Sequence, residues 1–278
     1  MFRSIRCLLS TLLLLAGALP AWGAGKESPL AMTVRPVEWT IDGTTFEGRL
    51  VFGDGLHGKV PGLVMVPNWM GVTEESITRA REIAGNRYVV LVADVYGKGV
   101  RPADKAQARE QVGKAYADGG TTVRRRVAAA VDALKGQAGA LPLDPSKVGA
   151  LGFCFGGGAV LELARTGAKL SGVASIHGDL GTHLPPSATG IRSPVLVLNG
   201  AADTSVSDES IVAFEKEMDA LGADWQFVDY GGARHCFSQP EDRPADPKDN
   251  CRYDERAARR SMLLLQSFFD EQFGTREG

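Results

Sequence analysis

The sequence predicts an α/β protein, with a mostly parallel, doubly wound sheet flanked by helices in a single domain. Short apolar segments alternate with longer amphipathic ones, which is typical of parallel strands joined by helices that cover both faces. The length of 278 residues and the hydrophobic fraction of 44% suit one such domain with a substantial core. At residues 148–164, a buried-strand pattern passes through a glycine-rich turn into a helical pattern.

Residues 1–23 are interpreted as a signal peptide that is not part of the fold. Two arginines precede an apolar stretch at residues 8–19, which is too short to span a bilayer. Small residues at Ala21 and Gly23 place the expected cleavage after Gly23. We therefore expect a periplasmic or secreted domain at 24–278, with no membrane association after cleavage. A retained N-terminal anchor is the alternative.

The strand predictions start with a hairpin. Residues 34–39 and 46–52 are interpreted as two strands, because Asp42-Gly43 between them is a strong turn signal. Six further apolar runs, bounded by turn residues, are interpreted as buried strands. They occupy residues 61–66, 88–93, 148–153, 172–176, 194–199 and 225–230.

Helices are expected between the later strands and after the last one. Thr73 is a suitable N-cap for the first helix. The last helix has an apolar face that includes Met262, Leu265 and Phe269. The expected helices cover residues 73–84, 104–117, 121–136, 159–164, 207–221 and 254–273.

The glycine-rich turn has the spacing of a nucleophile elbow, Gly152-x-Cys154-x-Gly156, with cysteine at the usual serine position. Glycines two residues before and after the cysteine leave room for a sharp strand-to-helix turn. The N-terminus of the following helix points its N–H groups at the sulfur, which favours the thiolate. Taken alone, this stretch is also compatible with a phosphate-binding turn or an inert buried cysteine.

Two more polar residues follow predicted strands. Asp203 comes after strand 194–199 and His235 after strand 225–230, so both are expected beside Cys154 at the carboxyl edge of the sheet. The order nucleophile, acid, histidine is that of α/β-hydrolases. We assign Cys154 as the nucleophile, His235 as general base and acid, and Asp203 as the residue that orients the imidazole.

A tetrahedral intermediate also needs hydrogen-bond donors for its oxyanion. One expected donor is the backbone N–H of Phe155, the residue after the nucleophile. The second is expected from the loop after strand 61–66, where we choose the backbone N–H of Trp69.

Five segments match the motifs of one known family: residues 69–72, 94–97, 152–157, 200–203 and 232–237. By these motifs the chain resembles the dienelactone hydrolase family of α/β-hydrolases over nearly all of the expected mature domain, and most of all its uncharacterised exported members. The resemblance implies the α/β-hydrolase fold and a cysteine hydrolase of esters or lactones that uses no metal or cofactor.

The resemblance also identifies candidate residues of the substrate pocket. Family members hold the resting thiol with a glutamate where this chain has the neutral Asn68. They bind the substrate carboxylate with two arginines, at positions that correspond here to Lys98 and Gln239. His177, after strand 172–176, either lines the pocket or is a structural histidine.

Three cysteines remain after signal-peptide cleavage, and export permits a disulfide between two of them. We expect Cys236 to pair with Cys251, because this leaves Cys154 as the single free thiol. The bond would close a polar, proline-rich loop that begins directly after His235. The alternative is that both cysteines stay unpaired.

Together these features predict an exported hydrolase of small-molecule carboxylic esters or lactones that forms an acyl-enzyme on Cys154. A thiol redox protein, or a non-catalytic binding protein on a hydrolase fold, is the alternative. The sequence has no Cys-x-x-Cys motif, which a redox protein would be expected to contain.

The net charge of −2 gives no sign of a nucleic-acid partner, and no cluster has metal-ligand spacing. The arginines at 124–126 are interpreted as a solvated helix face, with a phosphate-binding patch as the alternative. The oligomeric state is left open.

Overall fold

The computed structural model describes residues 31–275, so the predicted signal peptide lies outside the described residues. The predicted strands and helices are confirmed, most of them within a few residues at each end. The strands are β1 (Met32–Ile41), β2 (Thr44–Gly53), β3 (Val60–Val66), β4 (Val89–Val92), β5 (Leu143–Phe153), β6 (Val173–Ile176), β7 (Val195–Gly200) and β8 (Trp225–Tyr230). The α-helices are α1 (Glu74–Ala84), α2 (Lys105–Ala115), α3 (Thr121–Lys135), α4 (Phe155–Arg165), α5 (Asp208–Ala220) and α6 (Glu255–Phe273).

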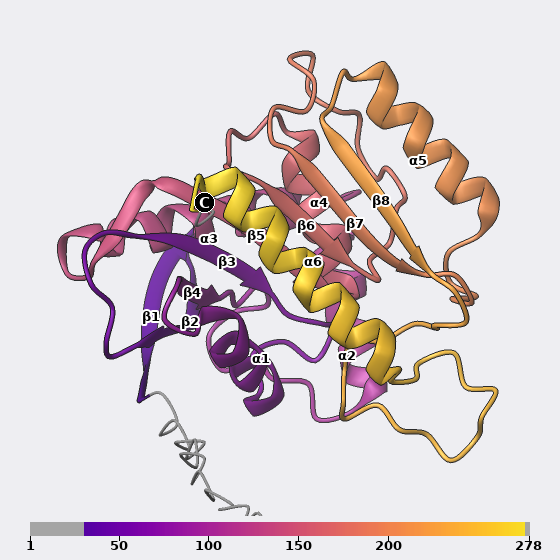
Figure 1. The fold of residues 1–278 in the computed structure, drawn as a ribbon, viewed down its shortest axis with the longest axis horizontal. Coiled ribbons are helices and arrows are strands. Elements are labelled where there is room, and N and C mark those ends of the chain that lie inside the picture. The colour runs from indigo at the N-terminus through magenta and orange to yellow at the C-terminus, as the bar shows by residue number, and fades with distance from the viewer. Residues whose placement is uncertain (1–30, 276–278) are drawn as a thin grey trace, which may run out of the picture.

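The strands form one eight-stranded sheet in the order β1-β2-β4-β3-β5-β6-β7-β8. The β1–β2 hairpin is antiparallel, and β2 also pairs antiparallel with β4, whereas all pairs from β4 to β8 are parallel. The hairpin turn has positive φ at both Asp42 and Gly43, as the Asp-Gly signal predicts. This mostly parallel arrangement confirms the predicted α/β-hydrolase architecture (Figure 1).

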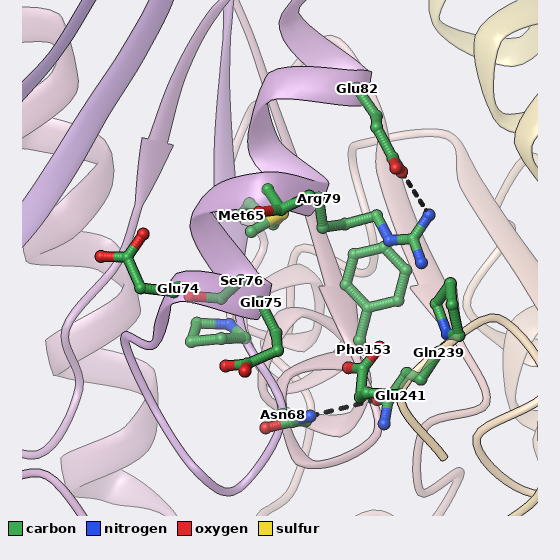
Figure 2. A pocket seen from close by; sticks show the side chains of 13 residues that line it. Met65, Asn68, Glu74, Glu75, Ser76, Arg79, Glu82, Phe153, Gln239 and Glu241 are labelled. Atoms are coloured by element: carbon green, nitrogen blue, oxygen red, sulfur yellow. Dashed lines mark hydrogen bonds and ion pairs between the residues drawn. The ribbon is translucent and has the colours of Figure 1, made fainter. Parts of the chain in front are cut away.

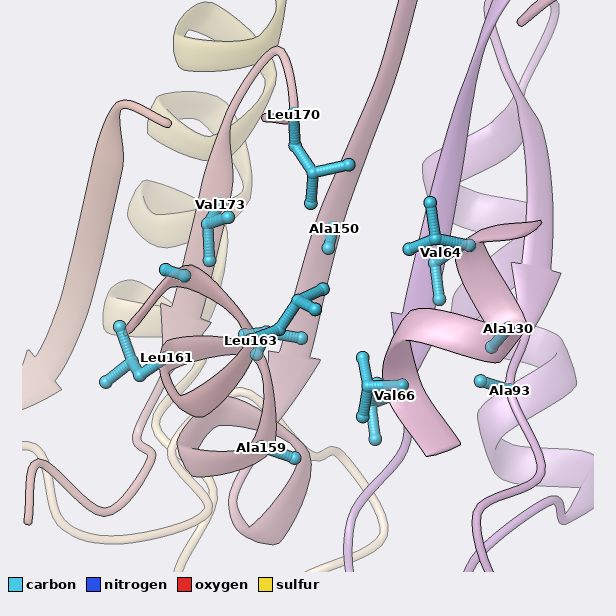
Figure 3. Close-up of a cluster of buried hydrophobic side chains, with 14 of the residues drawn as sticks. Val64, Val66, Ala93, Ala130, Ala150, Ala159, Leu161, Leu163, Leu170 and Val173 are labelled. Atoms are coloured by element: carbon cyan, nitrogen blue, oxygen red, sulfur yellow. The ribbon is translucent and has the colours of Figure 1, made fainter. Parts of the chain in front are cut away.

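Two apolar layers cover the sheet, because its side chains alternate between the faces. On one face Val64 and Val66 pack with α3 and α4 (Figure 3). Residues of α5 belong to the same apolar cluster. On the other face Leu63 and Met65 pack with α1 and α6. Figure 1 shows α6 crossing this second face. Every central strand is thus buried on both sides, which explains why the sequence shows continuous apolar runs rather than alternation.

Three local predictions need correction. β5 begins at Leu143 rather than residue 148, because Leu143 pairs with Val60 before a register shift in the ladder. α4 begins at Phe155 rather than residue 159, so the glycines after the elbow are already helical. The third concerns the arginines at 124–126, which do not form a solvated face.

Arg124 is largely buried and forms an ion pair with Glu162 at 2.7 Å. Arg126 donates to the Val95 carbonyl oxygen and lies over the Phe46 ring. Arg125 is exposed, in an ion pair with Asp42. The helix turns these three consecutive residues in different directions, so a run of charge does not make one surface.

Among the helices of residues 31–275, none combines the length and the apolar character that crossing a bilayer requires.

Candidate active site

Cys154 occupies the sharp turn between β5 and α4. Its backbone has φ 53° and ψ −119°, a conformation that non-glycine residues rarely adopt. A Cβ on Gly152 would lie 2.1 Å from the carbonyl oxygen of Gly156, and one on Gly156 would lie 2.1 Å from the carbonyl oxygen of Val66. Only glycine fits at both positions, so the sequence spacing follows from the close contacts of the turn.

The structure brings the three predicted triad residues together. His235 Nε2 lies 3.0 Å from Cys154 Sγ, and His235 Nδ1 lies 2.7 Å from Asp203 Oδ2. The side chains meet because β5, β7 and β8 run parallel and end at the same edge of the sheet. The resulting hydrogen-bonded chain runs from sulfur through imidazole to carboxylate.

The hydrogen bonds and charges among these three side chains favour the charged forms of His235 and Asp203. Burial alone lowers the pKa of His235, but the hydrogen bonds to Asp203 and Cys154, with the charges of both, raise it to about 10. Burial raises the pKa of Asp203, but hydrogen bonds from His235, Asn250 and the Ser205 backbone lower it to about 2. At neutral pH His235 is therefore favoured as the imidazolium, between Cys154 Sγ and the Asp203 carboxylate.

The two backbone N–H groups chosen for the oxyanion hole both have free hydrogen-bonding capacity. Phe155 is the first residue of α4, where an N–H has no acceptor within the helix. Within residues 31–275, neither this group nor the N–H of Trp69 donates to another protein atom. Tyr96 links the two residues, since its hydroxyl donates to the Trp69 carbonyl oxygen at 2.9 Å and its ring stacks on Phe155 at 5.7 Å.

Cys154 and His235 open into a cavity of about 760 Å³ between the loop after β3, the start of α2 and the loop that follows His235. A second cavity of about 450 Å³ adjoins it on the side of α1 (Figure 2). Asn68, Glu75, Gln239 and Glu241 line both cavities. The Asn68 amide donates to Gln239 Oε1 at 3.2 Å, so two predicted pocket residues form a bridge where the cavities meet (Figure 2).

The other two predicted pocket residues do not line these cavities. Lys98 is half exposed, and its ammonium group lies 2.6 Å from Glu38, away from Cys154. His177 is fully buried, with Nε2 at 2.9 Å from Ser238 Oγ and its ring packed edge-on against His235. Burial and the charge of His235 lower the pKa of His177 well below its ordinary value, so it is a neutral packing residue. Lys98 therefore lies outside the two cavities, and the structural alternative holds for His177.

Sequence reasoning missed several residues of the site. Lys105 and Arg109 project from α2 into the larger cavity, one helical turn apart. Asn250 donates to Asp203 Oδ1 at 2.9 Å from a segment with no helix or strand signal. Tyr96 lay within one of the matched motifs, but the spacing of that motif gave no role for its hydroxyl.

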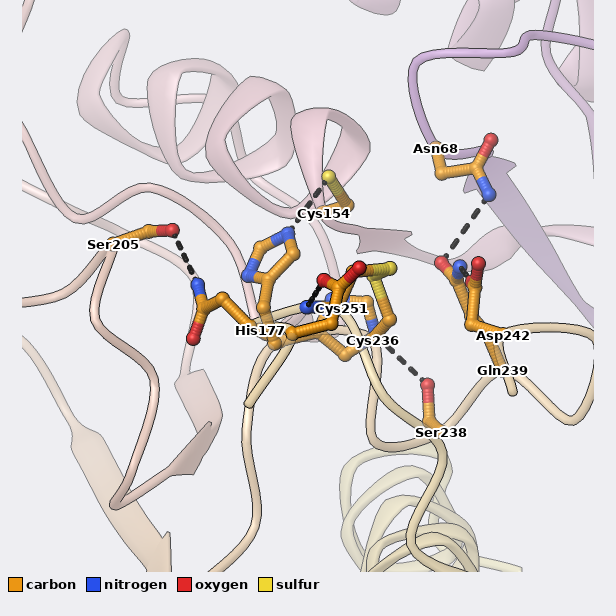
Figure 4. The surroundings of a disulfide bond; sticks show 12 residues. Asn68, Cys154, His177, Ser205, Cys236, Ser238, Gln239, Asp242 and Cys251 are labelled. Atoms are coloured by element: carbon orange, nitrogen blue, oxygen red, sulfur yellow. Dashed lines mark hydrogen bonds between the residues drawn. A yellow bond between two sulfur atoms is a disulfide. The ribbon is translucent and has the colours of Figure 1, made fainter. Parts of the chain in front are cut away.

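The structure contains a disulfide between Cys236 and Cys251, with a Cα separation of 4.9 Å (Figure 4). Among residues 31–275, Cys154 is the free cysteine. Within residues 31–275, Cys236 and Cys251 also form a group with Asp242 that is close enough for metal ligation. The disulfide consumes both sulfurs, so this group does not present a pair of thiolates to a metal ion.

Comparison with known proteins agrees with this architecture. The chain is 25% identical over 229 residues to a putative carboxymethylenebutenolidase of Salmonella typhimurium, and the match covers 80% of each chain. It is 37% identical to a solved dienelactone hydrolase-like promiscuous phosphotriesterase from metagenomic libraries, with a TM-score of 0.79 over 87% of this chain and 99% of that one. A solved putative dienelactone hydrolase from Klebsiella pneumoniae shares the fold, with a TM-score of 0.73 over 87% of this chain and 99% of that one, at 20% identity.

Residues 46–273 match the model of the Dienelactone hydrolase family. The matched segment includes the sheet from β2 onwards, the elbow, and the positions of all three predicted triad residues. The chain belongs to the dienelactone hydrolase family of α/β-hydrolases and is an ester or lactone hydrolase.

Proposed function

We propose that this protein is an exported cysteine hydrolase that cleaves carboxylic esters or lactones through an acyl-enzyme on Cys154. The observation that carries the proposal is the hydrogen-bonded chain from Cys154 Sγ through His235 to Asp203, with its sulfur end open to a large cavity. The proposed reaction needs no metal or cofactor, because protein groups supply the nucleophile, the proton carrier and the oxyanion donors.

In the proposed first half-reaction, the Cys154 thiolate attacks the substrate carbonyl carbon. The Trp69 and Phe155 N–H groups stabilise the oxyanion. The His235 imidazolium then donates its proton to the leaving alkoxide, and Cys154 is left as a thioester. In the second half-reaction His235 takes a proton from water, the hydroxide attacks the thioester, and the carboxylic acid leaves.

The charges that line the larger cavity support a preference for esters without a free carboxylate. Five carboxylates line the larger cavity, whereas its fixed cations are Lys105 and Arg109. At the position of one family arginine stands the neutral Gln239, and Lys98 lies elsewhere. The proposed substrates are therefore esters or lactones without a free carboxylate, since a carboxylate would meet net negative charge.

Export belongs to the same proposal: residues 1–23 are the signal peptide and residues 24–278 the mature domain. The disulfide supports this assignment, because such bonds persist in oxidising compartments. The expected outcome is a periplasmic or extracellular protein that starts at Ala24 and has one titratable thiol per chain when denatured without reduction. A cytoplasmic protein that retains Met1 and has all its cysteines reduced would overturn it.

The main test is turnover of a chromogenic short-chain ester by the mature protein, with Cys154→Ala as the inactive control. Mass spectrometry after rapid acid quenching should find the acyl group on the peptide that carries Cys154. Turnover that persists in Cys154→Ala would exclude the proposed nucleophile. Binding of the ester without turnover by the wild type would favour a binding protein instead.

Hydrolysis of phosphotriesters is a second candidate activity. It rests on the 37% identity to the promiscuous phosphotriesterase, which extends over 87% of this chain. A thiolate in an open cavity can attack a neutral phosphorus ester as it attacks a carbonyl. Stoichiometric release of a chromogenic leaving group, followed by turnover and lost in Cys154→Ala, is the expected result; no release would remove this candidate.

A further inference from the structure

One side-chain amide, that of Asn250, contacts the segment that carries the triad acid. Its Nδ2 donates to Asp203 Oδ1 at 2.9 Å and to Ser205 Oγ at 2.9 Å, and its Oδ1 accepts from the Thr204 N–H at 2.9 Å. Three consecutive residues are thus held by a single amide that lies 47 positions further along the chain than Asp203.

Asp203 depends on this contact because its carboxylate is fully buried. Oδ2 accepts from His235, and Oδ1 accepts from the Ser205 N–H at 2.8 Å and from Asn250. A buried carboxylate that loses one of three donors is less well stabilised and freer to rotate away from His235. The Asn250 hydrogen bond also contributes to the low pKa of Asp203.

The position of Asn250 is in turn set by the disulfide. Asn250 precedes Cys251, which is bonded to Cys236, the residue directly after His235. The Arg252 N–H donates to the His235 carbonyl oxygen at 2.8 Å, which ties the same segment to the triad base. Residues 239–249 between the two cysteines form no helix or strand and are largely exposed.

We propose that Asn250 is a positioning residue for Asp203 and that the Cys236–Cys251 disulfide holds it in place, so that full activity requires the oxidised bond. This inference rests on the proposed triad. It adds to that triad a fourth side chain, Asn250, and a disulfide that holds this side chain in place. Neither of the two contacts the substrate or Cys154 in the proposed reaction.

The first test is the Asn250→Ala variant. We expect kcat to fall about 10- to 100-fold, the range for a lost hydrogen bond to a charged group, with little change in KM. The acid limb of the pH–kcat profile should move to higher pH, because removal of the donor raises the pKa of Asp203. Asn250→Asp keeps the side-chain size but removes the donor, so it should lose at least as much activity while remaining folded.

The second test separates the disulfide from the amide with a double-mutant cycle. Cys236→Ser combined with Cys251→Ser should lower kcat by a factor similar to that of Asn250→Ala, and the triple variant should lose little more. Lys248→Ala is the matched control in the same loop, since within residues 31–275 its hydrogen bonds come from its backbone and not from its side chain. It should keep wild-type kcat.

Wild-type kcat and pH profile in Asn250→Ala would overturn the inference, and so would additive losses in the cycle. Either result leaves the proposed function intact if Cys154→Ala is inactive. An active Cys154→Ala protein would instead refute the proposed function itself, whatever Asn250 does.

Discussion

A single helix, α4, has a buried polar cluster at each end, and only one of the two clusters is suited to chemistry. At its N-terminus lies the group of Cys154, His235 and Asp203, which we propose to be catalytic and call the catalytic cluster. At its C-terminal end, Glu162 pairs with Arg124 at 2.7 Å and with Arg165 at 3.0 Å. We call this second group, together with Glu217, the ion-pair cluster.

The ion-pair cluster is saturated. Arg165 is 1% exposed and Glu162 is fully buried. Arg165 also binds Glu217 through two nitrogens and donates to the carbonyl oxygens of Leu180 and Gly181. The cluster therefore ties α3, α4, α5 and the 180–184 loop together, and its groups have little capacity left for a ligand.

The catalytic cluster differs in access: Cys154 and His235 are partly exposed, whereas Glu162 and Arg165 are buried. Cys154 Sγ has a single hydrogen-bond partner within residues 31–275, His235, and faces a cavity of about 760 Å³. A buried polar network thus becomes a reactive site where one member keeps unused bonding capacity and a substrate can reach it. Four predictions sharpen this comparison.

The largest expected effect comes from Asp203→Asn. An amide cannot stabilise the His235 imidazolium and favours the wrong tautomer, so kcat should fall by about 10⁴-fold. The free energy of unfolding should fall by less than in Glu162→Gln below, because His235 can lose its proton once the carboxylate is gone, whereas an arginine cannot. Steady-state kinetics and urea unfolding measure both. Retention of a tenth of the activity would remove Asp203 from the catalytic cluster.

The same carboxylate-to-amide change in the ion-pair cluster, Glu162→Gln, should instead lower the stability of the fold and leave turnover unchanged. It leaves buried arginine charge undercompensated, so we expect about 3 kcal/mol of lost stability. Turnover per folded molecule should remain that of the wild type. A fall in kcat with unchanged urea unfolding would show that the two ends of α4 are coupled.

Tyr96→Phe tests the support of the oxyanion loop. Loss of its hydrogen bond to the Trp69 carbonyl oxygen should lower kcat by about 5-fold, in keeping with the net value of a neutral hydrogen bond. Tyr116→Phe is the matched control, because Tyr116 also contacts the Phe155 ring, while its hydroxyl makes no hydrogen bond within residues 31–275. Equal effects of the two variants would contradict a role for the Tyr96 hydroxyl.

The smallest expected effect is the change with pH in the rate at which Cys154 is alkylated. The pKa of His235 is raised to about 10, so an imidazolium faces Cys154 Sγ across neutral pH, and we predict that it keeps the sulfur reactive. The contribution of the His235 imidazolium to the stability of the fold is complete below pH 6.5, the ordinary histidine value, and is lost as the pH rises through about 10.

Iodoacetamide alkylation of Cys154 should therefore change by less than about threefold between pH 6 and 8.5, whereas an ordinary thiol changes by about 150-fold. In His235→Ala the steep dependence should return, and Cys154→Ala should take up no label at this site. A steep profile in the wild type would mean that the resting cysteine is a neutral thiol.

The sequence by itself determined the sheet, the elbow and the positions of the triad residues. Apolar runs and turn residues act over a few neighbours, so they can be recognised without a tertiary structure. Parallel strands end at one edge, so residues after three different strands were expected to meet there. The disulfide was likewise expected, from the three cysteines that remain after the predicted signal-peptide cleavage.

Only the tertiary structure decided which side chains complete each cluster. Asn250 reaches Asp203, Arg124 reaches Glu162, and Lys98 turns to Glu38 instead of the cavity. These pairs join residues 47, 38 and 60 positions apart, and no local pattern encodes them. The physical reason is that periodicity and turn chemistry set where the backbone goes, whereas a long polar side chain takes whichever partner the packed elements bring within about 3 Å.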